Sequence, residues 1–118
     1  MGTLCTSKVT DMYTLFYKDE VIGDISKWNV SHVTNMSYIG TWNVSNVTNM
    51  SYMFSTTNFN QDISKWNTIS LIDIRYMFAY NPEFNQDLSN WNKSSISSSK
   101  VVDYSRDTFS WKDEYKIF

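Results

Sequence analysis

Asparagine directly follows a tryptophan at four places in the chain. Among the polar residues of the sequence, these asparagines are the best candidates for binding a ligand. The four residues are Asn29, Asn43, Asn67 and Asn92. A carboxamide both donates and accepts hydrogen bonds, so a row of them suits a glycan or a polar protein surface. The residues near this row that carry a charge or a ring nitrogen are Lys27, Lys65 and His32. These seven residues form the predicted binding face. The structural alternative is that the asparagines bond to their own neighbours in turns.

The residue types of the sequence give little indication of a catalytic site. His32 is the single histidine and could serve as a general base. No serine, cysteine or carboxylate lies at a spacing that would support it. Other repeat units place Asn46, Ser70 or Ser95 at its position, which favours an ordinary exposed polar site. We therefore expect no catalytic residue and no enzymatic activity.

Metal and cofactor sites are not expected either. Asp24, Asp62 and Asp87 recur at one position of the repeat and could bind calcium between units. Aspartates at such positions more often accept hydrogen bonds in turns. Cys5 is the single cysteine, which excludes an internal disulfide and, with a single histidine, a structural zinc site. Gly2 and Cys5 fit an acylation pattern that the sequence leaves undecided.

The bulk composition indicates one folded domain. The chain has 118 residues, of which 42% are hydrophobic and 17% aromatic, which suits a packed core. A formal charge of −2 provides no basic face for nucleic acid. No stretch approaches the roughly 20 apolar residues of a transmembrane segment, and the N-terminus lacks the features of a signal peptide.

An internal repeat determines the expected architecture. "WNVSHVTNMSY" at 28–38 returns after 14 residues as "WNVSNVTNMSY" at 42–52, whereas the next tryptophans, Trp66 and Trp91, follow at intervals of 24 and 25 residues. Repetition of this kind predicts a solenoid. The repeat region spans 9–96 between an N-terminal cap at 1–8 and a C-terminal cap at 97–118. Its units lie near 9–32, 33–46 (truncated), 47–70 and 71–96.

Two patterns within a unit predict its elements. Ile63-x-x-Trp66-x-Thr68 has the spacing of a leucine-rich-repeat strand, with the tryptophan pointing inward and Asn67 outward. Val47, Met50, Met53 and Phe54 follow at the spacing of one apolar stripe on a helical or 3₁₀ turn. The expected fold is a leucine-rich-repeat solenoid of about four coils, one truncated. Short parallel β-strands would line one concave face, joined by short helical or 3₁₀ turns.

The repeated phrases also resemble a known family. "FNQDIS" at 59–64 and "WNVSNVTNMSYMF" at 42–54 are similar to the BspA-like leucine-rich repeats of bacterial surface proteins and mycoplasma-type lipoproteins. The resemblance covers about residues 9–96. It implies a non-catalytic binding or adhesion module at the cell surface or secreted, and it provides no binding residues to transfer.

The truncated unit lacks the equivalent of residues 53–62, which carry large apolar side chains. For each missing side chain, neighbouring apolar side chains would stay uncovered, and the hydrophobic stabilisation lost would be about 2 kcal/mol. Either this coil folds into a tight kink or a second chain covers the gap. We expect a homodimer through the truncated coil or through the ends of the solenoid, since repeat ends expose core and backbone.

The sequence thus supports two functions. The first is a non-catalytic module that binds a protein or a glycan. The second is a structural element for self-association that has no external ligand.

Overall fold

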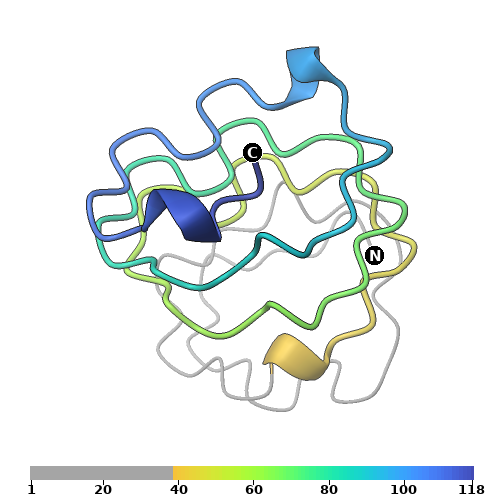
Figure 1. Cartoon of the computed structure of the whole chain (residues 1–118), viewed down its shortest axis with the longest axis horizontal. Helices are drawn as coiled ribbons and strands as arrows, with labels where there is room; N and C mark the ends of the chain where they lie inside the picture. The colour runs from red at the N-terminus through yellow and green to blue at the C-terminus, as the bar shows by residue number, and fades with distance from the viewer. Residues whose placement is uncertain (1–38) are drawn as a thin grey trace, which may run out of the picture.

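The computed structural model describes residues 39–118 as irregular backbone with three 3₁₀ turns (Figure 1). These turns are η1 (Ile39–Thr41), η2 (Ser98–Lys100) and η3 (Asp113–Tyr115). Within this part of the chain there is no α-helix, and an isolated parallel β-bridge joins Asn49 to Asp73. The order of the molecule therefore comes from how successive coils stack.

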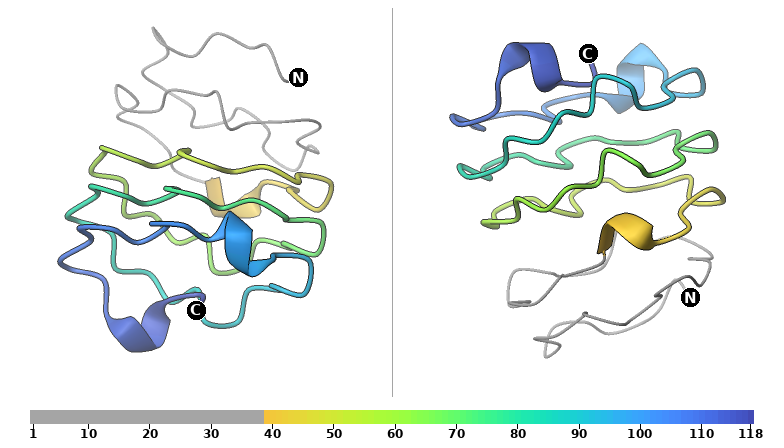
Figure 2. Two further views of the ribbon diagram at one scale, coloured as in Figure 1. Left: turned by 90° about the horizontal axis from the view of Figure 1, so that it is seen from above. Right: turned by 60° about the horizontal axis from the view of Figure 1, so that its bottom comes forward.

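Figure 2 shows the described chain as repeated layers that lie one beyond another. Each layer contributes one segment to a shared side, and we call residues 49–56, 73–80 and 100–107 the turn runs. Alternate N–H groups of one run donate to carbonyl oxygens of the next, over 2.8 to 3.0 Å. From the first run to the second, Met50, Tyr52, Phe54 and Thr56 donate to Asp73, Arg75, Met77 and Ala79. From the second to the third, Ile74, Tyr76, Phe78 and Tyr80 donate to Lys100, Val102, Tyr104 and Arg106.

The turn runs are not strands because the backbone bends at every second or fourth residue. Positive φ angles recur at matching positions: Tyr52 (62°), Thr56 (57°), Tyr76 (56°), Tyr80 (60°), Asp103 (51°) and Asp107 (55°). A strand needs negative φ throughout. Other N–H groups of the first two runs bond locally: Met53 donates to Met50 three residues back over 3.2 Å, and Ser51 donates to the Asn49 side chain over 2.9 Å. Asp73 is an exception, since its N–H donates to Thr48 of the preceding coil over 3.1 Å. Alternate backbone donors of these runs thus bond to the next coil, and most of the others bond within their own coil.

The predicted strand-based leucine-rich-repeat solenoid is therefore wrong. Residues 39–118 contain no β-strand and no sheet, so no row of parallel strands lines a concave face. The bonds between coils lie in the block at 47–54, which the apolar spacing assigned to a helical turn. The segment at 63–68, predicted as a strand, holds a single turn in which the Trp66 N–H donates to Ile63 over 3.2 Å.

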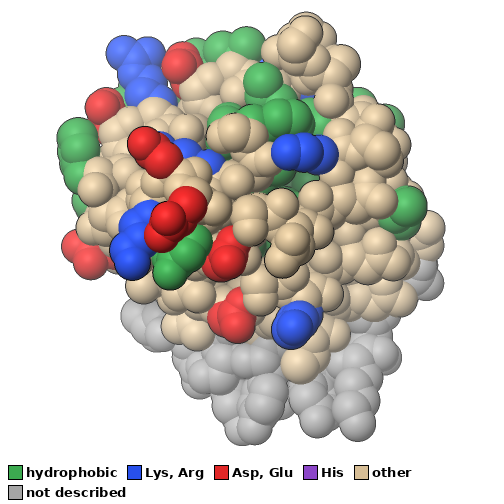
Figure 3. All heavy atoms as spheres, viewed as in Figure 1, with side chains coloured by type: hydrophobic (Ala, Val, Ile, Leu, Met, Phe, Trp, Pro, Cys, Tyr) green, Lys and Arg blue, Asp and Glu red, His purple; other side chains and the backbone are tan. Residues whose placement is uncertain are grey.

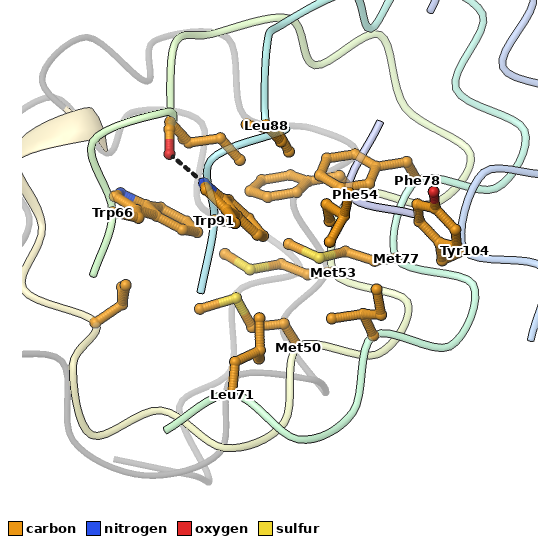
Figure 4. Packing of buried hydrophobic residues seen from close by; sticks show 14 of the residues in the cluster. Met50, Met53, Phe54, Trp66, Leu71, Met77, Phe78, Leu88, Trp91 and Tyr104 are labelled. Atoms are coloured by element: carbon orange, nitrogen blue, oxygen red, sulfur yellow. Dashed lines mark hydrogen bonds between the residues drawn. The ribbon is translucent and has the colours of Figure 1, made fainter. Parts of the chain in front are cut away.

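Tryptophan side chains tie consecutive coils together inside the stack. The indole Nε1 of Trp66 donates to the carbonyl of Ile39 over 2.9 Å, and that of Trp91 donates to Ile63 over 3.0 Å (Figure 4). The two rings stack with centroids 6.1 Å apart. Trp42 stacks on Trp66 in turn, at 6.4 Å. These three side chains are at most 4% exposed, so the prediction that the tryptophans lie in the core is confirmed for them.

Phenylalanines form a second stacked row in the core. Phe54 lies 3.8 Å from Phe59 and 5.7 Å from Phe78, and Phe78 lies 4.2 Å from Phe84, as centroid distances. Buried Asn81 closes the corner beside them. Its Nδ2 donates to the Phe59 carbonyl over 2.9 Å, and its Oδ1 accepts from the Phe84 N–H over 3.2 Å. The stacked rings, together with the hydrogen bonds of Asn81, thus fix the spacing between coils.

The C-terminal part of the truncated unit passes close to the next coil. A Cβ at Gly40 would lie 2.5 Å from the Asp62 carbonyl oxygen, so only glycine fits there without a backbone shift. The η1 turn therefore packs directly on the coil that follows it. The predicted N-terminal cap and most of the first two predicted units lie outside the described residues.

The segment predicted as a C-terminal cap continues the stack and then crosses its end. Residues 100–107 form the third turn run, and the Lys112 N–H donates to Asn85 Oδ1 over 3.1 Å, in line with the coil before. Beyond this point the Tyr104 hydroxyl donates to the Phe118 carbonyl over 2.8 Å, and Ile117 is buried. The chain thus covers the core of its own last coil.

We predict that Trp91→Phe lowers the free energy of unfolding by about 1–3 kcal/mol, because the buried Ile63 carbonyl loses its donor. Denaturant unfolding measures this change. Asn90→Ala, at the exposed neighbouring position, serves as the control and should alter stability by less than about 0.5 kcal/mol. Equal effects of the two variants would contradict a structural role for the indole bond.

Candidate functional site

The predicted asparagine row lies on the surface, and each side chain also stabilises its own turn. Asn43, Asn67 and Asn92 are exposed. Their Oδ1 atoms accept the backbone N–H two residues later, over 3.1, 3.2 and 3.1 Å respectively. In Asn43 and Asn92 the same oxygen also accepts a serine hydroxyl, over 2.6 and 2.7 Å. The carbonyl half of each amide is thus engaged locally, and binding through this row stays a prediction.

Other predicted residues are placed only in part. Lys65 is exposed, whereas Lys27, Asn29 and His32 lie outside the described residues. Asp62 and Asp87, which were weighed as calcium ligands, accept the backbone N–H groups of the serines two residues later over 2.9 and 3.0 Å. Hydrogen bonding to the side chain of that serine, and then to its backbone N–H, lowers the pKa of both carboxyls. Within residues 39–118, no cluster of three or more histidine, cysteine or acidic side chains could hold a metal ion.

A different pair of asparagines joins neighbouring coils, and the sequence reasoning did not single it out. The Asn85 N–H donates to Asn60 Oδ1 over 2.9 Å, and Gln86 Nε2 donates to the same oxygen over 3.0 Å. Asn85 Oδ1 then accepts from Lys112 one coil further on. The repeated "NFNQD" and "EFNQD" phrases were the available signal for this contact. Their role is structural, since these amides are used in bonds between coils.

Exposed tyrosines on the turn runs make the most distinctive surface of the described chain. Tyr52 and Tyr76 stack face to face, with centroids 4.9 Å apart and planes 5° from parallel. Hydrogen bonding to the neighbouring Asp103 carboxylate, and then its charge, raise the pKa of the Tyr76 hydroxyl. Asp103 also pairs with Arg106 over 3.4 Å, and the Arg106 guanidinium lies over Tyr80 at 5.9 Å. These five residues form one connected network across three coils, which we call the tyrosine–arginine surface.

The backbone at these three tyrosines has positive φ angles, which bulky residues adopt at a cost. Tyr52, Tyr76 and Tyr80 all have φ near +60°, a region that costs a bulky residue about 1–2 kcal/mol. The two outer rings gain little burial in return, since Tyr52 is 56% and Tyr80 45% exposed. Glycine or asparagine would satisfy the same backbone at lower cost. Aromatic residues kept at strained and exposed positions are typical of binding sites.

An ion pair borders this surface and holds the second turn run in place. The Asp73 carboxylate accepts from the Arg75 backbone N–H over 3.0 Å and from its Nη2 over 2.7 Å, and Lys100 Nζ lies 3.9 Å away. Asp73 is buried, whereas the Arg75 side chain is 43% exposed. Burial alone would raise the pKa of Asp73, but the hydrogen bonds and charge of Arg75, with the charge of Lys100, lower it overall.

The face of the described residues seen in Figure 3 carries charged side chains of both signs. On the face in Figure 3, basic and acidic side chains are interspersed with polar ones. Among the described residues, no helix has the length and apolar character to cross a bilayer. Recognition by this part of the chain would therefore depend on local contacts between side chains.

Comparison with known proteins gives one match. The family described as "Mycoplasma protein of unknown function, DUF285" matches the chain over residues 1–39 and 37–113. No curated protein matches the chain. No solved structure matches it.

We predict that Asp73→Asn makes stability less sensitive to acid. The lowered pKa of Asp73 means that its stabilisation is present above the ordinary value of 3.8 and is lost as the pH falls through the folded-state pKa. The wild type should therefore lose more stability than the variant between about pH 5 and pH 3. Denaturant midpoints across this range measure the difference.

The substitution is conservative because Asn49 already occupies the equivalent position and accepts the Ser51 N–H over 2.9 Å. Asp113→Asn is the control, since that carboxyl is 97% exposed in its pair with Lys116 and should contribute little. Parallel pH profiles for the wild type and Asp73→Asn would show that the ion pair adds no stability.

Proposed function

We propose that this chain, which belongs to the DUF285 family of Mycoplasma proteins of unknown function, is a non-catalytic module that binds a protein or a glycan. The observation that carries the proposal is the tyrosine–arginine surface. Tyrosine and arginine are the residue types that most often supply binding energy at interfaces. Their rings and guanidinium present broad contact area with few rotatable bonds to immobilise.

The stacked arrangement favours a ligand that spans more than one coil. Tyr52 and Tyr76 come from successive turn runs, and Tyr76 connects to the third run through Asp103. The pairing of Asp103 with Arg106 fixes the arginine over Tyr80 before any ligand arrives. A preformed site of this kind loses less conformational entropy on binding.

The repeat phrases support a role in adhesion. Their resemblance to BspA-like bacterial surface proteins favours a cell-surface or secreted location, and this role is part of the proposal. The asparagine row remains a second candidate face, because the Nδ2 groups of Asn43, Asn67 and Asn92 belong to exposed side chains. The two faces can be tested separately.

Self-association is the second candidate function, including a homodimer through the truncated coil or the ends of the stack. The observation that favours it is that large apolar side chains of the last coil are exposed: Phe109 is 83% exposed, Phe118 53% and Val102 47%. Exposed apolar side chains are available for contact with another chain.

We predict that Tyr52→Asn combined with Tyr80→Asn weakens ligand binding while the fold is kept. Asparagine tolerates positive φ, which offsets the lost ring contacts, so stability should stay within about 1 kcal/mol of the wild type. Binding is measured on glycan arrays and on displayed peptide libraries, followed by titration of the ligands found. We expect affinity to fall at least about tenfold, or 1.4 kcal/mol.

A matched variant carries bulky residues at the asparagine row, Asn43→Gln, Asn67→Trp and Asn92→Gln, and should keep its affinity. Loss of binding in this variant alone would move the site to the asparagine row. If the wild type binds nothing on either array, the proposed binding function is wrong for these ligand classes.

A further inference from the structure

Two cationic side chains share one buried carboxylate at the border of the tyrosine–arginine surface. Arg75 Nη2 lies 2.7 Å and Lys100 Nζ 3.9 Å from the same oxygen, Oδ2 of Asp73. The Asp73 side chain is 8% exposed, whereas those of Arg75 and Lys100 are 43% and 37% exposed. Within residues 39–118, neither cation pairs with a second carboxylate. This cluster therefore carries one positive charge in excess, and its cationic groups are the part that solvent reaches.

Both cations keep hydrogen-bond donors for a further anion. Asp73 accepts from Nε and Nη2 of Arg75, whereas Nη1 donates to no residue of the described chain. Lys100 Nζ carries three donors and, at 3.9 Å, is beyond hydrogen-bond distance of Asp73. A carboxylate has two oxygens and can accept from a guanidinium and an ammonium group together. We call Arg75 and Lys100 the cation pair.

Exposed apolar and aromatic side chains lie around the cation pair. The Tyr52 N–H donates to the Arg75 carbonyl and the Tyr76 N–H to the Val102 carbonyl, both over 3.0 Å. Tyr52, Arg75 and Val102 therefore occupy neighbouring positions of successive coils. Tyr52 is 56% exposed, Val102 47%, and Ile72, directly before the second turn run, 43%. Arginine and tyrosine surrounded by contacts that exclude water are typical of the centre of a protein–protein interface.

The tyrosines of this surface have ring faces that are already in contact with other groups. Tyr52 and Tyr76 stack with their planes 5° from parallel, so each covers one face of the other. The Arg106 guanidinium lies over the ring of Tyr80. A sugar ring packs its C–H groups on an open aromatic face, where the quadrupole is negative, whereas a ring edge carries partial positive charge and attracts acidic groups. The edges of the stacked tyrosines and the cation pair thus favour the same kind of ligand.

We propose that the partner of the tyrosine–arginine surface is a protein segment with acidic side chains, one of whose carboxylates binds between Arg75 and Lys100. This inference rests on the proposed binding function and names the chemistry of its partner. A protein is favoured over an acidic glycan because Tyr52, Ile72 and Val102 can contact apolar side chains beside the acidic ones.

The test is selection of displayed random peptides on the full chain, in parallel with a glycan array that includes sialylated and sulfated members. Aspartate and glutamate should be enriched at least about twofold in the selected peptides over the input library, because opposite charges attract at this surface. A selected peptide is then titrated beside a counterpart in which each acidic residue is replaced by its amide. The amide peptide should bind at least about tenfold more weakly.

We predict that Lys100→Gln weakens binding of the acidic peptide at least about fivefold. This change removes one cation and leaves the hydrogen bonds between Asp73 and Arg75 in place, so the amide NMR spectrum should show a kept fold. Lys100→Arg retains the charge and should bind within about twofold of the wild type. Lys112→Gln is the matched control, because it makes the same charge change at an exposed lysine outside the turn runs and should bind as the wild type does.

Some results would overturn this inference and leave the proposed binding function in place. These are selected peptides without acidic enrichment, ligands found only on the glycan array, and full affinity of Lys100→Gln for a peptide that the Tyr52→Asn and Tyr80→Asn variant binds weakly. Equal losses in Lys100→Gln and Lys112→Gln would show a general charge effect and would overturn it as well. A wild type that binds no peptide and no glycan overturns the inference and the proposed function together.

Discussion

The interaction on which the stack depends is the hydrogen bond from a buried tryptophan to the backbone of the preceding coil. Trp66 and Trp91 donate to the carbonyls of Ile39 and Ile63, and Trp111 Nε1 donates to Gln86 over 2.8 Å. Each bond satisfies a polar group that burial would otherwise leave unpaired. It also fixes the distance between coils, so the rings can stack and the turn runs can meet in register.

That register in turn explains the unusual backbone. In the first two turn runs alternate N–H groups donate to the next coil, most of the others bond within their own coil, and positive φ angles recur at matching positions. A flat strand would pair more regularly, but it would not bring Met50, Met53 and Phe54 to the same buried side. The stack therefore packs its side chains as in a series of turns, while its backbone hydrogen bonds between coils resemble those between neighbouring strands.

Surface and core are divided by the same repeat. Trp42, Trp66, Trp91 and the phenylalanines Phe54, Phe78 and Phe84 are buried, whereas Tyr52 and Tyr80 of the first two turn runs are exposed. Backbone hydrogen bonds and aromatic stacking inside the coils hold this part of the chain together, and the proposed tyrosine–arginine surface lies outside that core.

The sequence by itself determined the period of the repeat, the burial of Trp42, Trp66 and Trp91, and the outward position of Asn43, Asn67 and Asn92. These follow from the alternation of apolar and polar residues, which fixes the side of the chain that faces the core. The asparagine row could be placed on the surface, but its use in turns depends on backbone geometry that the pattern does not contain.

Only the tertiary structure decided which segment bonds between coils and that the chain forms no strands. An N–H group in "VTNMSYMF" can donate within a turn or to the next coil, and the two bonds are similar in energy. The choice is made by the neighbouring coils, whose stacked rings set the distance at which one partner or the other is reached. The tyrosine–arginine surface was missed for the same reason: Tyr52, Tyr76 and Tyr80 come together with Asp103 and Arg106 only when three coils are stacked in register.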